Sequence, residues 1–331
     1  MTAFGSQFMP KMSLTEYRDG AWSSSQITDC DRVTLHAGAH VLHYASSVFE
    51  GLKAFKHSDG SVKLFRPDRN IARLARSSQL LHLPAVDEAQ VREMIFSIVA
   101  HYAAQTPEPP GSMYVRPTHI GTEPAIGAAA AGSTSSMLYV LLSPVGDYFA
   151  GGSGGLSILV EEDYARCAPH MGVVKSGSNY ASALGPILQA KQEYGAAQIL
   201  FCPNGDVQET GASNFLLIDG DEIITKNLDS TFLHGVTRDS ILALARDKGM
   251  QVSERALSTD ELFERIAKPE CEAALSGTAA VLTPVSTLIR NGKPHKVGSG
   301  LEGKTTAALR AELNAIQWGQ AEDKFNWLQS V

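Results

Sequence analysis

The sequence has little cysteine, no long apolar run and no excess of basic residues, and each shortage excludes a class of protein. The four cysteines among 331 residues are scattered, and no two stand at the spacing of a zinc site or a CxxC motif. We therefore expect no metal site and no disulfide framework, which suits a reducing compartment such as the cytoplasm. No apolar run is long enough to span a bilayer, and the first residues lack the apolar region of a secretory signal.

The charge balance of the chain is acidic, with 28 Lys and Arg against 35 Asp and Glu and a net charge of −7 at pH 7. This balance argues against a surface for nucleic acid or for an anionic membrane. With 44% hydrophobic and 19% charged residues, the composition is that of a globular protein. The length suits one large domain or two of ordinary size.

Periodic apolar residues separated by turn residues predict a mixed α/β chain of two domains. A run rich in Gly and Ser at 145–155 indicates a linker between a small N-terminal domain, 1–144, and a larger C-terminal domain, 156–331. Helices are expected near 179–194, 232–249 and 304–317. Strands are expected at 62–67, 112–121, 137–146, 156–163, 197–203, 213–219 and 272–285, with a strand and turn at 33–42.

The stretch GVVKSGSNYASA, residues 172–183, holds a lysine that follows an apolar run and precedes small polar residues. A lysine shielded from water has a lowered pKa, because desolvation disfavours the ammonium, and its free amine can form a Schiff base with an aldehyde. The small neighbours of Lys175 leave room for a flat ring, and Tyr180 places a phenol five residues on. The residues alone leave open that Lys175 is an ordinary exposed lysine.

Tyr114 and Arg116 are two residues apart in a predicted strand, so they share one face of its sheet. That face would be polar in the middle of an apolar sheet. A buried arginine needs an anionic partner. A substrate carboxylate and a structural Asp or Glu are both open as that partner.

Further candidate residues lie at turns and helix starts. Glu209 is flanked by small residues that would let a ring approach, although an exposed turn glutamate fits equally. The backbone N–H groups of 235–237 begin a helix and form a ready anion site, or an ordinary helix cap. Residues 276–278 break a strand and present hydroxyl and N–H groups to a second anion. Arg73 lies beside the inward face of a helix, where it points into a cleft or into solvent.

Eight segments occur in this order along the chain: HYASSVFEGLKAF, LFRPDRNIARL, YVRPTHIGTEPAIG, LLSPVGDYF, KSGSNY, QETGASNF, GVTRD and SGTAA. Together they resemble the branched-chain aminotransferases, which are pyridoxal-phosphate enzymes of fold type IV. The match runs over almost the whole chain from about Phe4. The IGTEP and SPVGDYF segments look most like the branch of the family that includes the eukaryotic enzymes.

The resemblance implies two α/β domains with pyridoxal 5'-phosphate between them, held mostly by the C-terminal domain. It implies reversible transfer of the amino group between L-leucine, L-isoleucine or L-valine and 2-oxoglutarate. Relatives of fold type IV are homodimers whose sites are completed by the neighbouring chain, so a homodimer is implied here too. Small molecules are the expected partners, rather than nucleic acid or a membrane.

Carried over residue by residue, the resemblance makes Lys175 the Schiff-base lysine and proton shuttle. Tyr180 would hydrogen-bond the cofactor phenolate oxygen, and Glu209 would pair with the pyridine nitrogen. The residues implied for the phosphate are Arg73, Val236, Thr237 and Thr278. The residues implied for the substrate are Tyr44, Phe49 and Tyr148 around its side chain, Tyr114 and Arg116 at carboxylates, and the Ala279 and Ala280 amides at the α-carboxylate.

Three positions depart from the family pattern. Val281 and Pro284 stand where eukaryotic relatives carry a CxxC pair, which excludes a thiol switch there. Ala212 replaces a threonine, so one hydroxyl contact to the substrate carboxylate is missing. Ser178 replaces a glycine that usually precedes Asn-Tyr.

Two other functions are alternatives to the branched-chain enzyme. One is another fold-type-IV activity, either a D-amino-acid or amine transaminase or an aminodeoxychorismate lyase. The other is a protein that binds pyridoxal phosphate without turnover. The Tyr114–Arg116 pair favours the branched-chain group over the first alternative. An intact set of Lys175, Tyr180 and Glu209 speaks against the second.

Overall fold

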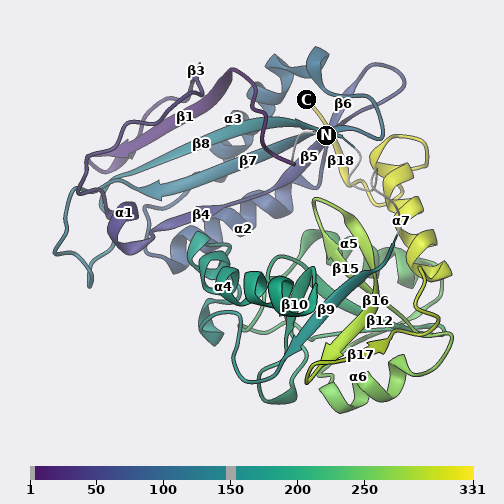
Figure 1. The fold of residues 1–331 in the computed structure, drawn as a ribbon. Helices are drawn as coiled ribbons and strands as arrows, with labels where there is room; N and C mark the ends of the chain where they lie inside the picture. Colours follow the sequence, from purple (N-terminus) through teal and green to yellow (C-terminus); the bar gives the residue numbers. More distant parts are fainter. Residues whose placement is uncertain (1–3, 147–153) are drawn as a thin grey trace. The chain divides into compact units, whose positions relative to one another are not determined.

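The computed structural model describes residues 4–146 and 154–331. The chain forms two compact units, each with its own sheet and helices (Figure 1). Unit 1 contains Met1–Asp147, Val174–Ser178 and Ile316–Val331, and unit 2 contains Tyr148–Val173 and Asn179–Ala315. The mixed α/β class predicted from the sequence is confirmed.

Two short segments return to unit 1 after the chain has entered unit 2. One of them, Val174–Ser178, carries Lys175, and the other is the C-terminal segment Ile316–Val331. The two predicted domains, 1–144 and 156–331 with a linker at 145–155, are continuous segments and contain no such returns. These domain boundaries stay a prediction. Most of the expected linker lies outside the described residues.

Unit 1 is built on an antiparallel sheet in the order β18-β6-β5-β7-β8-β1-β2, with β3 beside β1 and β4 beside β7. Its strands are β1 Lys11–Arg18, β2 Ala21–Trp22, β3 Gln26–Asp29, β4 Ser47–Phe49, β5 Leu52–Lys56, β6 Val62–Phe65, β7 Ser112–Gly121, β8 Ser136–Val145 and β18 Leu328–Ser330. Its helices are α1 His40–Tyr44, α2 Pro67–Leu80, α3 Glu88–His101 and the short 3-10 turn η1 Ala103–Gln105.

Helices α2 and α3 cover one face of this sheet (Figure 1). Helix α2 begins at Pro67, where the missing N–H costs nothing, and buries Ile71 and Leu74. The Asp87 side chain caps α3 by accepting hydrogen bonds from the N–H groups of Ala89 and Gln90. The opposite side of the sheet therefore remains available for a site.

Of the strand and turn predicted at 33–42, the strand is wrong: no strand forms there, a turn lies at 37–38, and α1 begins at His40. The buried His40 ring is held by hydrogen bonds and not by strand pairing. Its Nδ1 lies 2.9 Å from Ser46 Oγ, and its Nε2 lies 3.2 Å from the Ala131 carbonyl. A loosely alternating pattern could not reveal these side-chain bonds.

Unit 2 contains a sheet in the order β11-β10-β9-β16-β15-β12-β13-β14, with β17 beside β16. Its strands are β9 Leu156–Glu161, β10 Gln198–Phe201, β11 Glu209–Thr210, β12 Asn214–Asp219, β13 Glu222–Thr225, β14 Gln251–Glu254, β15 Glu272–Gly277, β16 Val281–Arg290 and β17 Lys293–Lys296. The remaining helices of the chain are α4 Gly177–Tyr194, α5 Val236–Asp247, α6 Thr259–Ile266 and α7 Lys304–Gln317, with 3-10 turns η2 Pro169–Met171 and η3 Pro203–Gly205.

The two-residue strand β11 closes this sheet on itself, since it pairs with β10 on one side and with β12 on the other. Glu209 is the residue that pairs on both sides, opposite Phe201 in β10 and Asn214 in β12. The main chain of Glu209 is therefore held from two directions.

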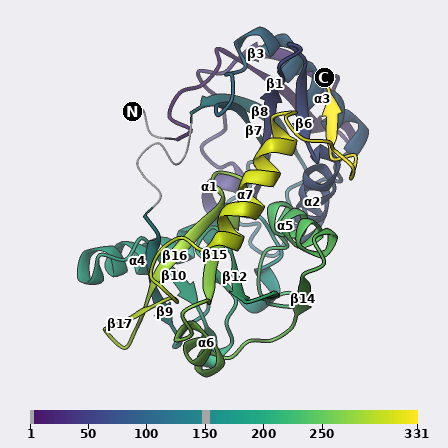
Figure 2. The same ribbon diagram turned by 90° about the vertical axis from the view of Figure 1, so that its right-hand side faces the viewer.

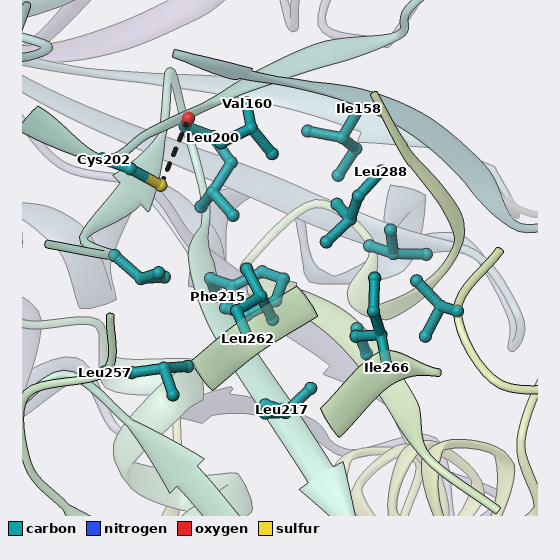
Figure 3. Close-up of a cluster of buried hydrophobic side chains, with 14 of the residues drawn as sticks. Ile158, Val160, Leu200, Cys202, Phe215, Leu217, Leu257, Leu262, Ile266 and Leu288 are labelled. Carbon is teal, nitrogen blue, oxygen red and sulfur yellow. Dashed lines mark hydrogen bonds between the residues drawn. The ribbon is translucent and has the colours of Figure 1, made fainter. Parts of the chain in front are cut away.

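The core of unit 2 lies between the sheet and α6 (Figure 3). Leu262 and Ile266 of α6 pack with Phe215 and Leu217 of β12, and all four are at most 2% exposed. Burying side chains of this size contributes about 1.5–3 kcal/mol each. On another side of unit 2, α5 packs against β14 and β15 (Figure 2).

Among the helices of residues 4–146 and 154–331, none combines the length and the apolar character that crossing a membrane requires.

Candidate active site

A cavity of about 410 Å³ lies on the sheet of unit 1. Tyr114, Arg116 and Thr118 of β7 reach it from alternate positions of the strand, as their two-residue spacing predicts. Apolar and aromatic side chains supply much of the remaining wall. The other lining residues are Phe4, Gly5, Phe8, Ser47, Phe49, Tyr139, Leu141, Leu142 and Ser143.

Arg116 is the charged residue of this cavity. Its Nη2 donates to the Tyr114 hydroxyl at 2.9 Å, and the guanidinium carbon lies 4.6 Å from the centroid of the Phe49 ring. Its Nε is buried and has no hydrogen-bond partner within the described residues. No Asp or Glu of that part of the chain forms an ion pair with Arg116. A buried donor left unpaired costs about 1–3 kcal/mol, so an anionic ligand would gain by binding here.

Lys175 is attached to unit 1 through its main chain. Its N–H donates to Ser77 Oγ at 3.2 Å, and its carbonyl accepts from the N–H of Phe49 at 3.0 Å. The following residue, Ser176, forms a bridge with Val48 of β4. The side chain is half-buried, and Nζ lies 5.1 Å from the centroid of the Phe49 ring. The structure thus brings Lys175 to the aromatic ring that also lines the cavity of Arg116.

The Arg73 side chain does not extend into solvent. It forms an ion pair with Glu50. Arg73 Nε donates to Glu50 Oε1 at 2.7 Å and Nη2 to Oε2 at 2.8 Å. Burial raises the pKa of the Glu50 carboxyl, but the charge and hydrogen bonds of Arg73 and the charge of Lys175 lower this pKa by more. The pKa of Glu50 therefore lies below its ordinary value, and the carboxyl is ionised at neutral pH.

Sequence reasoning missed Glu50. The available signal was a carboxylate placed in the apolar segment VFEGL, because a buried charge requires a partner. The partner stands 23 residues away on another element, which local periodicity does not reveal.

Glu209 lies on β11 of unit 2 and is only 2% exposed, so it is not an exposed turn residue. Its Oε1 accepts from the N–H of Leu233 at 3.0 Å and also from Nη1 of Arg166. Arg166 is itself 2% exposed, and its guanidinium carbon lies 5.4 Å from the centroid of the Tyr180 ring. Unit 2 therefore gathers Glu209, Arg166 and Tyr180.

Arg166 was also missed, and no pattern in the sequence marks it. It stands in the segment DYARCAPHM between β9 and the lysine stretch, where apolar periodicity is lost. Desolvation lowers the pKa of Arg166, but the charges of Glu209, Tyr180 and Cys167 and the hydrogen bond to Glu209 together raise this pKa by more, so Arg166 stays charged.

Helix α5 begins at Val236 after Gly235, and Thr237 is buried in its first turn. Asn214 of β12 holds the preceding turn by donating to the Leu233 carbonyl at 2.8 Å. A Cβ on Gly235 would lie 2.0 Å from Asn214 Oδ1, so this close approach requires glycine. The first turn of α5 presents N–H groups suited to a phosphate.

Thr278, Ala279 and Ala280 form the turn between β15 and β16, where the sequence predicted a break. Ala212 is exposed in the turn between β11 and β12.

Two predicted pocket residues lie elsewhere. Tyr44 is at the end of α1, where its hydroxyl donates to the Ile126 carbonyl, and it does not line the cavity of unit 1. Tyr148 lies outside the described residues.

Comparisons with known proteins agree on one family. A family model described as amino-transferase class IV matches residues 47–288. The branched-chain-amino-acid transaminase 1 of Bacillus subtilis (strain 168) is 37% identical over 336 residues, which cover 99% of this chain and 94% of that protein.

Two solved structures share the fold. The branched-chain amino acid aminotransferase from Escherichia coli superposes with a TM-score of 0.76 at 25% identity, over 96% of this chain and 98% of that one. The branched-chain aminotransferase of Thermobaculum terrenum in its PLP form has a TM-score of 0.79 at 21% identity, over 96% and 97% of the two chains.

Proposed function

The chain belongs to the class IV aminotransferases, and from this premise we propose that it is a branched-chain amino acid aminotransferase. It exchanges the amino group of L-leucine, L-isoleucine or L-valine with 2-oxoglutarate, reversibly and with pyridoxal 5'-phosphate as cofactor. The observation that carries this proposal is a cavity that joins an aromatic wall to a half-buried Arg116, whose Nε is buried and unpaired and which has no carboxylate partner in the described chain.

The residues of the chain fit pyridoxal phosphate. Glu209 supplies a buried carboxylate for a protonated ring nitrogen, and Tyr180 supplies a phenol for the ring oxygen. A phosphate monoester carries about −1.5 to −2 charge near neutral pH. Such a charge suits the guanidinium of Arg73, the first turn of α5 at Val236 and Thr237, and the Thr278 hydroxyl.

When bound, pyridoxal phosphate is the electron sink for removal of a proton from the α-carbon. The chain supplies placement, charge and the base. Lys175 Nζ accepts the proton from the amino acid α-carbon and returns it in the reverse half-reaction. The ionised carboxylate of Glu209 keeps the ring nitrogen protonated.

The two substrates demand opposite properties from one cavity. A branched apolar side chain gains from leaving water for the Phe49 and Tyr114 rings. A glutamate γ-carboxylate instead needs a cation, and Arg116 offers two N–H edges to it. The amides of Ala279 and Ala280 serve the α-carboxylate that all substrates share. Ala212 offers no hydroxyl there, which lowers affinity and leaves the chemistry unchanged.

A homodimer in the cytoplasm completes the proposal. The four cysteines form no disulfide within the described chain, which supports a reducing compartment. Tyr44 stands away from the cavity of its own chain, which supports a role toward a second copy. Sedimentation equilibrium of the purified protein tests this, and a monomer at micromolar concentration would contradict it.

Single-turnover reactions test the activity. Protein loaded with pyridoxal phosphate is mixed with L-leucine or with D-alanine, and the loss of the cofactor absorption band is followed. Conversion by L-leucine alone is expected, and Lys175→Ala abolishes it. Conversion by D-alanine alone would indicate a D-amino-acid transaminase, and conversion by neither would indicate a binding protein.

A further inference from the structure

We propose that Arg166 is a positioning residue of the active site, which fixes Glu209 and Tyr180 in one arrangement and sets the charge around them. This inference rests on the proposed function, because it takes Glu209 and Tyr180 as the residues that hold the cofactor ring. Arg166, Glu209 and Tyr180 all lie in unit 2.

The guanidinium of Arg166 is held at two of its nitrogens. Nη1 donates to Glu209 Oε1, and Nε donates to the Gly211 carbonyl at 3.2 Å. A guanidinium is planar, so two such bonds define its orientation. Gly211 packs closely against Ile187, since a Cβ there would lie 2.4 Å from Ile187 Cδ1.

Glu209 is fixed in turn by groups on four segments. Its main chain pairs with β10 and β12, and its Oε1 accepts from both Arg166 and the N–H of Leu233. Two donors on one oxygen leave the carboxylate little freedom to rotate. Glu209 is therefore held before any ligand binds, as a group that acts on a reaction must be.

The third member of the arrangement is Tyr180, in the first turns of α4. Its ring centroid lies 5.4 Å from the Arg166 guanidinium carbon, within the range of a cation–π contact. The groups whose charges act on Arg166 are Glu209, Tyr180 and the neighbouring Cys167. One cation thus faces both residues proposed to bind the polar atoms of the cofactor ring.

The positive charge has a chemical consequence. A cation beside Glu209 and Tyr180 disfavours protonation of groups bound near them. Removal of the charge should therefore raise the pH at which the absorption band of bound pyridoxal phosphate titrates. For charges several ångströms apart in a protein, the expected rise is about one pH unit.

The experiment compares Arg166→Gln with Arg290→Gln. Arg290 is a matched control, because it is an ion-paired arginine of the same unit whose partners are Glu162 and Asp260. The readouts are the band midpoint against pH, the dissociation constant of pyridoxal phosphate and the single-turnover rate with L-leucine.

For Arg166→Gln we expect a midpoint about one unit higher and a rate about 100-fold lower, on the scale of one lost electrostatic contact. Arg290→Gln should leave both unchanged. A wild-type midpoint and rate in Arg166→Gln would overturn the proposal.

Two further variants keep the proposal testable if Arg166→Gln does not fold. Arg166→Lys retains the charge but loses the planar guanidinium. The pH midpoint of the absorption band should therefore be unchanged, while the single-turnover rate with L-leucine should fall about tenfold. An unchanged rate in Arg166→Lys would overturn the positioning role. The double variant Arg166→Gln/Glu209→Gln removes both buried charges, and it should be more stable than Arg166→Gln alone.

The proposed function can fail separately. If the wild-type chain takes up no pyridoxal phosphate and shows no band, the function is wrong. If the wild type reacts with L-leucine but Arg166→Gln behaves like it, only the role of Arg166 is wrong.

Discussion

Glu50 and Arg73 are joined by two parallel hydrogen bonds of 2.7 Å and 2.8 Å. Asn70 adds a third donor to the carboxylate, at 2.7 Å from Oε2. The Glu50 side chain is 1% exposed and the Arg73 side chain 12%, so the pair lies almost wholly out of solvent. A bidentate pair of this kind holds the guanidinium in a defined plane. The Arg73 guanidinium is therefore already oriented, as its proposed role toward a phosphate requires.

Replacing one partner of this pair should destabilise the folded protein. In Glu50→Gln the Arg73 charge loses its counter-charge while buried, and the free energy of unfolding should fall by about 3–5 kcal/mol. Urea denaturation at pH 7 measures it. The double variant Glu50→Gln/Arg73→Met should recover much of that loss. Equal instability of the single and double variants would show that the unpaired charge is not the cause.

The Glu50–Arg73 ion pair also predicts that the free energy of unfolding depends on pH. Because the pKa of Glu50 is lowered in the folded protein, its stabilisation is present above the unfolded value of 4.5. It is lost as the pH falls through the lower folded value, since the unfolded state then binds the extra proton. As the pH falls, the free energy of unfolding of Glu50→Gln should lack the decrease that protonation of Glu50 causes in the wild type.

Arg116→Ala should separate the two half-reactions. A hydrogen bond to a charged group contributes about 1.5–3 kcal/mol, so the glutamate half-reaction should slow about 10–100-fold. Leucine has no γ-carboxylate, and its half-reaction should change less than about threefold. Stopped-flow rates with each amino acid measure this. Arg92→Ala, at an exposed position on α3, is the control, and equal losses with both substrates would remove the γ-carboxylate role.

Glu209→Gln should retain the cofactor but slow its chemistry. The amide keeps an oxygen that can accept from Leu233 and Arg166 but removes the negative charge. The proton-transfer rate should fall on the order of 10²–10³, the scale of one lost electrostatic contact. Single-turnover kinetics with α-deuterated leucine measures the step. Near-normal turnover would show that Glu209 does not pair with the ring nitrogen.

His119 should make unit 1 sensitive to acid. The ring is fully buried between Ser78 Oγ at 2.9 Å and Ser136 Oγ at 2.8 Å, and burial lowers its pKa from 6.5 to about 3. Because the folded pKa is the lower one, the stabilisation is present above pH 6.5 and is lost as the pH falls toward 3. The full difference is roughly 5 kcal/mol at about 1.36 kcal/mol per pH unit.

The measurement for His119 is the free energy of unfolding against pH in wild type and in His119→Gln. The difference between the two curves should narrow below pH 6.5. His101→Gln, at an exposed histidine of α3, should follow the wild type. Parallel curves for wild type and His119→Gln would contradict the buried neutral ring.

Elements with strong local signals could be predicted from the sequence. Helix α7 occupies Lys304–Gln317 as expected, because Leu309, Leu313 and Ile316 repeat at the helical period and are all buried. The break predicted at 276–278 appears two residues later, as the turn at 278–280 between β15 and β16. These features depend on residues close to one another in the chain.

Contacts between distant residues could not be predicted from periodicity. Arg166 and Glu209 are 43 residues apart, and neither interrupts a regular apolar pattern. The resemblance to the family implies a role for Glu209 but does not identify the cation that neutralises it. Once a buried carboxylate is proposed, the need for a cation follows from desolvation, although its position does not.

The shortness of β11 has a consequence for how this chain tolerates insertions and deletions. Side chains alternate between the two faces of a strand, so a shift of one residue turns each of them to the opposite side. Removing one residue from 211–213 would therefore redirect the Glu209 carboxylate away from Leu233 and Arg166. We expect homologous chains to keep the length of this hairpin constant even where its residue types vary.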